Sequence, residues 1–140
     1  MKKNRVLWVD SEALSEHDRS ESLREWIMEE CEVVFVIAQT VEEAEKTLKE
    51  EKFSFIITES WMNGKRWEGL SFIQKLREGK LGENISTVPV VIFSTSFHLL
   101  LKEDPERVKR IIGLPGKTIH IKKPTDIFEF KKEIESILNT

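Results

Sequence analysis

The chain has 140 residues, of which 39% are hydrophobic and 34% charged, so it can bury the core of one ordinary domain. Its net charge of −3 argues against non-specific binding of nucleic acid, which needs a basic surface. The single cysteine, Cys31, cannot form an internal disulfide, and no apolar run is long enough for a signal peptide or a membrane span. We therefore expect one soluble, cytoplasmic domain over residues 1–140 that binds neither nucleic acid nor membrane.

Five β-rich runs alternate with helical patterns along the chain. The predicted strands cover residues 5–9, 32–37, 53–58, 88–94 and 117–121. Three of these runs are almost continuous Val, Ile and Phe, which is typical of parallel strands that are covered on both faces. Trp8 lies in the first run and is expected in the core.

The helical patterns lie between these strands. The first, over residues 11–30, is polar until Leu23, so we expect this helix to begin late or to break. The second opens with a capping box formed by Thr40 and Glu43. The remaining helices are predicted over residues 68–78, 104–113 and 124–138, the middle one with Asp104 as N-cap, Pro105 in first position and Gly113 as its stop.

Five strands alternating with five helices predict a doubly wound α/β fold. This is a flavodoxin-like three-layer sandwich around a five-stranded parallel sheet of order 2-1-3-4-5. The functional crevice of such a fold lies beyond the carboxyl ends of its strands. The residues at those ends are Asp10, Ser11 and Glu12 after the first strand, Glu59 after the third, Ser94 and Thr95 after the fourth, and Lys122, Lys123 and Pro124 after the fifth.

These strand ends bring acids, a hydroxyl and a lysine to one edge of the sheet. Such a set suits a small anion that is handled together with a divalent cation. It suits equally well a network of salt bridges that performs no chemistry.

The segments "VLWVD", "FIITE", "VVIFS" and "KKP", at their observed intervals, resemble the receiver domain of two-component response regulators over nearly the whole chain. The resemblance implies a pair of acids after the first strand, a phosphorylated aspartate after the third, a Ser or Thr after the fourth and Lys-Pro after the fifth. By position, Asp10 and Ser11 match the acid pair, Glu59 the phosphoacceptor, Ser94 the switch hydroxyl, Lys123 the lysine and His120 the rotating aromatic residue.

The chemical positions depart from the family pattern. Glu59 carries one methylene more than aspartate, and a displacement of about 1 Å can slow a reaction by roughly a hundredfold. Ser11 replaces an acid, so Mg²⁺ binding by Asp10 and Glu59, with Glu12 as a further candidate, is expected to be weak. The favoured interpretation of Glu59 is an ion pair with Lys123, ahead of residual metal binding and of covalent phosphorylation.

Three other features could contribute to binding. Asn63-Gly64 predicts a turn in a loop about two residues longer than the family's, in which Trp61 and Trp67 either form a binding platform or cover the site. The apolar run 97–101, where the family's fourth helix begins, is expected to be half core and half association patch. His120 is expected to be packed or hydrogen-bonded.

We therefore predict a pseudo-receiver: a signalling module that is no enzyme, requires no cofactor and binds a histidine kinase, another receiver or an effector. A homodimer through the face of the fourth helix, fifth strand and fifth helix is one further option that the resemblance implies. The alternative is an active receiver that accepts a phosphoryl group at Glu59 with Mg²⁺. A flavin-binding flavodoxin-like domain is disfavoured because acids follow the first strand where a phosphate cradle needs glycines and hydroxyls. His17, His98, His120 and Cys31 lack the spacing of a zinc site.

Overall fold

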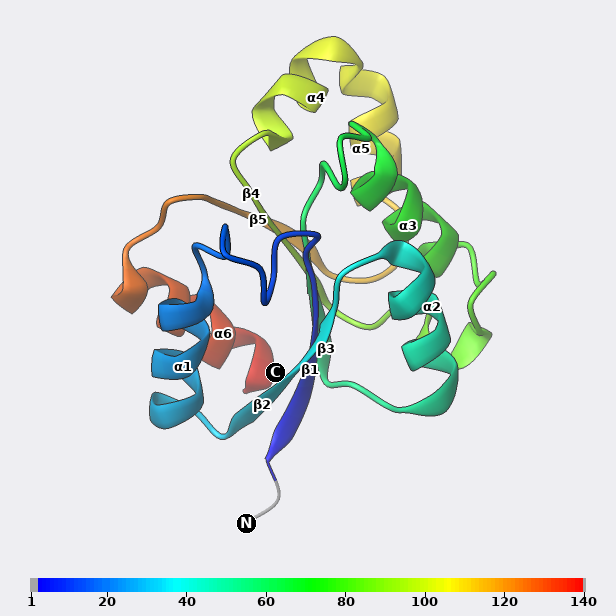
Figure 1. Cartoon of the computed structure of the whole chain (residues 1–140). Coiled ribbons are helices and arrows are strands. Elements are labelled where there is room, and N and C mark those ends of the chain that lie inside the picture. The colour runs from blue at the N-terminus through cyan, green and yellow to red at the C-terminus, as the bar shows by residue number, and fades with distance from the viewer. Residues whose placement is uncertain (1–2, 140) are drawn as a thin grey trace.

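The computed structural model describes residues 3–139 (Figure 1). In chain order the elements are β1 (Asn4–Val9), α1 (Glu21–Glu30), β2 (Val33–Ala38), α2 (Val41–Glu50), β3 (Phe55–Thr58), α3 (Glu68–Arg77), the short 3₁₀ helix η1 (Glu83–Ile85), β4 (Val90–Ser94), α4 (Phe97–Glu103), α5 (Pro105–Ile112), β5 (Thr118–Lys122) and α6 (Ile127–Leu138).

The five strands form one parallel sheet in the order β2-β1-β3-β4-β5, which confirms the predicted fold class. The near-continuous apolar sequence of β3 and β4 follows from their central place, since every residue of both strands is buried. The edge strand β5 buries only Ile121.

Helices cover both faces of this sheet (Figure 1). Successive strand residues point to opposite faces, so Leu7 and Val9 join the core on one side, while Val6 and Trp8 join the core on the other. The first core lies under α2, α3 and α5, and the second under α1 and α6. The expectation that Trp8 belongs to the core is confirmed, because its ring makes edge contacts with Phe93 at 5.8 Å between centroids and is 1% exposed.

The predicted number of helices was wrong by one, because two short α-helices, α4 and α5, occupy the stretch between β4 and β5. The break falls at Asp104, whose carboxylate accepts a hydrogen bond of 3.1 Å from the backbone N–H of Arg107. Pro105 follows in the first position of α5 and has no N–H with which to continue α4. Asp104, Pro105 and Gly113 thus have the predicted capping roles.

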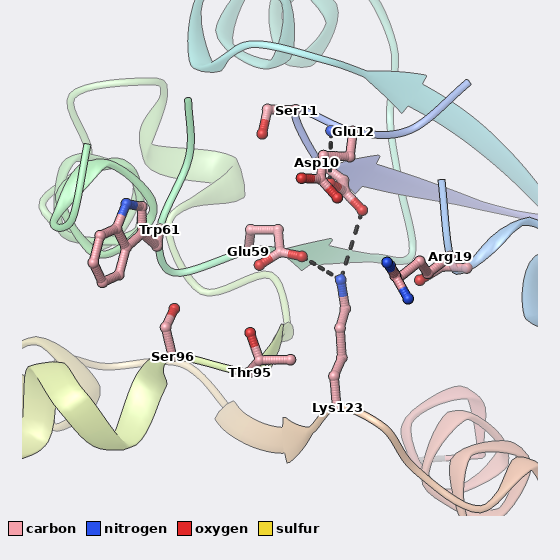
Figure 2. Close-up of a pocket in the computed structure, with 10 residues that line it drawn as sticks. Asp10, Ser11, Glu12, Arg19, Glu59, Trp61, Thr95, Ser96 and Lys123 are labelled. Carbon is pink, nitrogen blue, oxygen red and sulfur yellow. Dashed lines mark hydrogen bonds and ion pairs between the residues drawn. The ribbon is translucent and has the colours of Figure 1, made fainter. Parts of the chain in front are cut away.

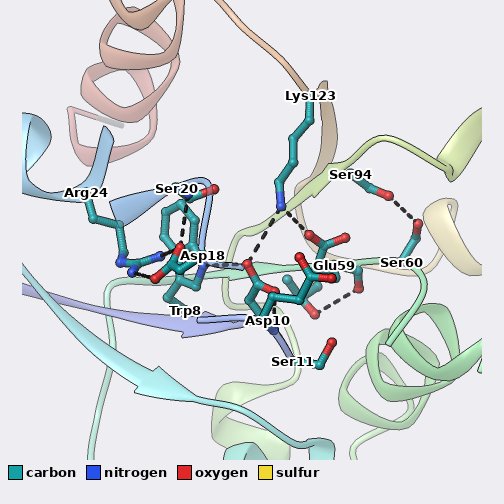
Figure 3. Close-up of polar contacts among 12 residues, drawn as sticks. Trp8, Asp10, Ser11, Asp18, Ser20, Arg24, Glu59, Ser60, Ser94 and Lys123 are labelled. Atoms are coloured by element: carbon teal, nitrogen blue, oxygen red, sulfur yellow. Dashed lines mark hydrogen bonds and ion pairs between the residues drawn. The ribbon is translucent and has the colours of Figure 1, made fainter. Parts of the chain in front are cut away.

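Helix α1 begins only at Glu21, as the polar sequence before it predicts. The preceding loop is held by Asp18, which accepts hydrogen bonds from the backbone N–H groups of Leu14 (2.9 Å) and Ser20 (3.0 Å) and pairs with Arg24 (Figure 3). Burial raises the pKa of Asp18, but these hydrogen bonds lower it more, so its net pKa lies below the ordinary value. The loop between β1 and α1 is therefore anchored along its length. Over residues 3–139, none of the helices combines the length and the apolar character that crossing a bilayer requires.

Candidate functional site

The carboxyl ends of the strands surround a cavity of about 420 Å³ (Figure 2). Asp10 follows β1, Glu59 follows β3 and Lys123 follows β5, so residues far apart in the sequence meet at one edge of the sheet. The cavity is lined by Asp10, Ser11, Glu12, Arg19, Ser20, Glu59, Trp61, Thr95, Ser96 and Lys123.

The ammonium group of Lys123 lies between two carboxylates (Figures 2 and 3). It contacts Oε1 of Glu59 and lies 3.7 Å from Oδ2 of Asp10. The three side chains are shielded from solvent, with exposed fractions of 18% for Lys123, 16% for Glu59 and 7% for Asp10. The predicted ion pair between Glu59 and Lys123 is therefore confirmed, and Asp10 shares the same cation.

Asp10 is fixed by its neighbours in sequence. Its Oδ1 accepts a hydrogen bond of 2.9 Å from the backbone N–H of Glu12, and its Oδ2 accepts a longer one of 3.5 Å from the indole N–H of Trp8. Both carboxylate oxygens thus have hydrogen-bond donors besides Lys123.

Burial raises the pKa of Glu59 above the ordinary glutamate value of 4.5, and the charges of Asp10 and Glu12 raise it further. Lys123 opposes this shift but does not cancel it. Glu59 therefore binds a proton more readily than an exposed glutamate does.

The backbone of Glu59 is held in place by the start of α3. The N–H of Gly69 donates to the carbonyl oxygen of Ser60 at 3.1 Å, and a Cβ atom at position 69 would lie only 1.8 Å from the carbonyl oxygen of Glu59. Only glycine allows the helix to approach the end of β3 this closely.

The loop between β3 and α3 contains the predicted turn. Asn63 and Gly64 have positive φ angles of 53° and 76°, and Met62 and Lys65 on either side exchange backbone hydrogen bonds of 3.1 and 2.8 Å. This is the geometry of a two-residue hairpin, for which Asn-Gly is the preferred sequence. The longer loop is thus ordered by its own turn.

Ser94 ends β4 but does not line the cavity. Its hydroxyl is fully buried and lies 2.6 Å from the hydroxyl of Ser60, the residue after Glu59 (Figure 3). The cavity instead receives the side chains of Thr95 and Ser96. Sequence reasoning missed Ser60, because nothing local connects it with a residue 34 positions away.

Ser11 and Trp61 join the cavity from the loops after β1 and β3. The hydroxyl of Ser11 accepts a hydrogen bond of 3.3 Å from the backbone N–H of Asn63. Trp61 lines the cavity, whereas Trp67 lies under the guanidinium of Arg107 at 4.2 Å and packs against the core. Of the two loop tryptophans, only Trp61 thus lies at the site.

No protein-family model matches the sequence, and no curated protein matches it. Solved structures do match. The receiver domain of a sensor histidine kinase from Pseudomonas aeruginosa PAO1, with a magnesium ion coordinated in its active site cleft, has a TM-score of 0.71 at 14% identity and covers 99% of both chains. A two-component response regulator from Clostridium difficile has a TM-score of 0.70 at 19% identity, covering 98% of this chain and 97% of its own. The response regulator TrrA from Thermotoga maritima, in complex with Mg²⁺-BeF, has a TM-score of 0.69 at 19% identity, covering 96% of this chain and 98% of its own. The fold is that of a receiver domain.

His120, which the resemblance matches to the rotating aromatic residue, lies on β5. Its ring stacks on Phe97 of α4, with ring centroids 4.3 Å apart and an angle of 30° between the planes. Partial burial lowers the pKa of His120, and the nearby charges of His98 and Lys122 lower it further, whereas a hydrogen bond with the backbone of Ser94 opposes this shift without cancelling it. His120 is therefore packed on one face, as predicted, although it stays exposed to solvent, and its lowered pKa favours the neutral imidazole.

The apolar run at the start of α4 divides as expected. Phe97 and Leu100 are buried in the core, with exposed fractions of 7% and 0%. Leu99 and Leu101 are 42% and 38% exposed. Two of the five residues in this run thus present apolar surface to solvent.

The side chains at the site do not fit a bound Mg²⁺ in this arrangement. Within residues 3–139, no three Asp, Glu, His or Cys side chains come together as metal ligands. Asp10 and Glu59 do face a common point, but the ammonium of Lys123 lies there. Mg²⁺ also requires near-ideal octahedral oxygen ligands, and Ser11 supplies a hydroxyl in place of a carboxylate.

Arg19 is one of three cavity residues that sequence reasoning missed, the others being Ser20 and Ser96. It lies in the loop before α1, and its side chain points toward the amino group of Lys123 (Figure 2). The only local signal for its position is the pair of Asp18 and Arg24. These two residues are six positions apart, and their ion pair joins the loop to α1.

Proposed function

We propose that this chain is a receiver-like signalling domain, one unit over residues 1–140, that works through protein–protein contacts without a phosphorylation cycle. The observation that carries this proposal is the Lys123 ammonium between Glu59 and Asp10. The cation that partly balances the two carboxylates thus belongs to the chain itself.

The contacts of two side chains, Glu59 and Ser94, support the proposal. Oε1 of Glu59 is engaged by Lys123, and this oxygen must leave that contact before it can attack phosphorus. The hydroxyl of Ser94 is bonded to Ser60 instead of facing the cavity. Both side chains expected to handle a phosphoryl group thus have other partners.

Incubation with Mg²⁺ and acetyl phosphate, followed by intact mass spectrometry, tests the proposal. Wild type is expected to stay unmodified. Glu59→Asp shortens the side chain, weakens its contact with Lys123 and is expected to gain a phosphoryl group. Glu42→Asp, the same change on the exposed surface of α2, serves as the matched control and is expected to stay unmodified.

Modification of wild type that disappears in Glu59→Gln would overturn the proposal. If Glu59→Asp also stays unmodified, the double variant Ser11→Asp/Glu59→Asp restores the missing acid. Its modification would show that the metal site, together with the nucleophile, is what the chain lacks.

The partner we propose is a signalling protein: a histidine kinase, another receiver or an effector. A second copy of the chain is a further candidate, docking through α4, β5 and α6, where Leu99 and Leu101 are exposed. Light scattering after size exclusion tests the second copy. We expect any dimer of wild type to dissociate in Leu99→Glu, and a monomer at high concentration would leave another protein as the partner.

The alternative function is an active receiver that accepts a phosphoryl group at Glu59 with Mg²⁺. It is favoured by the cavity of about 420 Å³ beside Glu59 and by the solved neighbours that hold Mg²⁺ or Mg²⁺-BeF. This function requires Lys123 to leave the space between Asp10 and Glu59. We propose that the chain is located in the cytoplasm, requires no cofactor and has no enzymatic activity.

A further inference from the structure

A second cavity adjoins the acidic one and is larger, at about 610 Å³. It lies between the start of α1 and the loop that joins β5 to α6, and Arg19, Ser20, Thr95 and Lys123 line both cavities. Its walls are formed by Arg19, Ser20, Ser22, Leu23, Phe93, Thr95, Lys123, Pro124, Thr125 and Ile127. Cavities of about 300–1,000 Å³ are typical of small-molecule sites.

The charges that line this second cavity are of one sign. Arg19 and Lys123 are cations, four lining residues carry hydroxyl groups, and no lining residue is acidic. The adjoining cavity holds Asp10, Glu12 and Glu59. An anion is therefore favoured in the second cavity and disfavoured in the first.

Arg19 has no partner of its own within residues 3–139, where its guanidinium forms no ion pair and no hydrogen bond. Its backbone is nevertheless fixed, because Asp18 on one side is bonded to Leu14 and Arg24, and Ser20 on the other side is 4% exposed. The side chain points toward Lys123, another cation (Figure 2). Lys123 is already paired with Glu59 and Asp10, so Arg19 carries the unbalanced positive charge, which an anion beside it would stabilise.

The rest of the lining is apolar. Leu23, Phe93 and Ile127 come from α1, β4 and α6, and Phe93 is 3% exposed while Ile127 is 39% exposed. The ring of Phe93 also lies 4.9 Å from the amino group of Lys123, so the apolar and cationic parts of the cavity are contiguous. This combination suits a ligand with an anionic end and an apolar body.

We propose that the second cavity binds a small organic anion, a carboxylate or phosphate monoester on an aromatic or branched body. The anionic group lies against Arg19 and the neighbouring hydroxyls, and the body lies against Leu23, Phe93 and Ile127. Glu59 does not line this cavity, although its partner Lys123 does, and the site goes beyond the proposed function because it needs neither phosphoryl transfer nor a protein partner.

Amide NMR of the ¹⁵N-labelled chain, titrated without Mg²⁺, tests this proposal. Phenyl phosphate and benzoate are the two anionic probes, and their comparison distinguishes a phosphate from a carboxylate head group. We expect saturable shifts for at least one of them at residues 19–23 and 123–127. Inorganic phosphate lacks the apolar body and benzyl alcohol lacks the charge. Each is therefore expected to bind at least about tenfold more weakly than the better anionic probe.

Matched variants locate the binding. Arg19→Gln removes the unpaired cation and is expected to lower the affinity for the better probe by about tenfold or more. Arg110→Gln, on the exposed surface of α5, is expected to leave that affinity unchanged. Ile127→Glu puts an acid in the cavity and is expected to abolish binding. Phe128→Glu makes the same change at the next position, which is 67% exposed and does not line the cavity.

Three results would overturn the proposal. The first is the absence of saturable shifts for both probes up to about 10 mM, which corresponds to a binding free energy weaker than about 3 kcal/mol. The second is equal binding of inorganic phosphate, which would mean that the apolar wall contributes nothing. The third is binding that Arg19→Gln and Ile127→Glu leave intact.

Discussion

At the scale of single residues, Glu59 has opposing influences on its charge. Burial and two neighbouring acids favour the protonated form, while the Lys123 ammonium favours the carboxylate. The net result is a raised pKa, which links the stability of the chain to pH.

We predict that the stability of wild type relative to Glu59→Gln falls as the pH rises. Because the folded-state pKa of Glu59 lies above 4.5, its contribution to stability is complete below pH 4.5 and is lost as the pH passes through the folded-state value. The glutamine variant carries no such charge, so the difference between the two proteins isolates this group. Urea denaturation of both proteins at a series of pH values from about 4 to 8 measures it, and a difference that is flat or rises with pH would contradict the prediction.

At the scale of elements, the connection from β3 to α3 contains two glycines with different roles. Gly69 meets the backbone of Glu59, whereas a Cβ atom at Gly64 would find open space within 4 Å. Gly64 is required only by its φ angle of 76°. A substitution at Gly69 therefore tests steric crowding, whereas one at Gly64 tests backbone strain.

We predict that Gly69→Ala lowers the free energy of unfolding by about 3 kcal/mol, because the carbonyl of Glu59 must move to admit the methyl group. Gly64→Ala, the matched control, is expected to lower it by about 1 kcal/mol through strain alone. Chemical denaturation measures both values. Equal losses at the two positions would show that α3 does not hold the end of β3 in place.

Local signals in the sequence predicted those elements that depend on local contacts. Thr40 caps α2 by accepting from the N–H of Glu43 at 3.0 Å, Asp104 caps α5, and Asn63-Gly64 forms its turn. The pair of Glu59 and Lys123 was also predictable, because both follow strands whose ends meet at one edge of the sheet.

The remainder of the site depends on distant contacts that no local pattern encodes. The Ser60 hydroxyl contacts Ser94 only because β3 and β4 are neighbours in the sheet. Nothing in either segment indicates that the hydroxyl of Ser94 points away from the cavity. Arg19 reaches the cavity because Asp18 and Arg24 close the loop around it. The break between α4 and α5 likewise depends on how the chain packs around Asp104, although Pro105 marks its place in the sequence.

At the scale of the whole molecule, Arg77 joins α3 to the edge of the sheet opposite the site. Its guanidinium donates to the carbonyl oxygens of Ser86, Val88 and Lys117 at 3.0, 2.6 and 2.8 Å, and to the hydroxyl of Thr118 at 3.0 Å. The side chain is buried without a carboxylate partner within residues 3–139, and burial lowers its pKa. These carbonyls have one common donor, so its loss affects β4 and β5 together.

We predict that Arg77→Lys lowers the free energy of unfolding by about 3 kcal/mol, because lysine cannot supply the planar set of donors and leaves the carbonyls of Ser86 and Val88 without them. Arg110→Lys, on the exposed surface of α5, is expected to change it by less than about 0.5 kcal/mol. Thermal and urea denaturation provide the comparison. A loss below about 1 kcal/mol for Arg77→Lys would mean that water replaces the missing donors.

Trp8 gives the site an optical reporter. Its indole is enclosed by aromatic rings in the core, yet its N–H points at Oδ2 of Asp10, one of the two carboxylates that share Lys123. Its fluorescence should therefore respond to a change of charge at the strand ends, while solvent quenchers are kept away by the core. With Trp26, Trp61 and Trp67 replaced by phenylalanine, emission from this one ring would follow events in the cavity without an attached label.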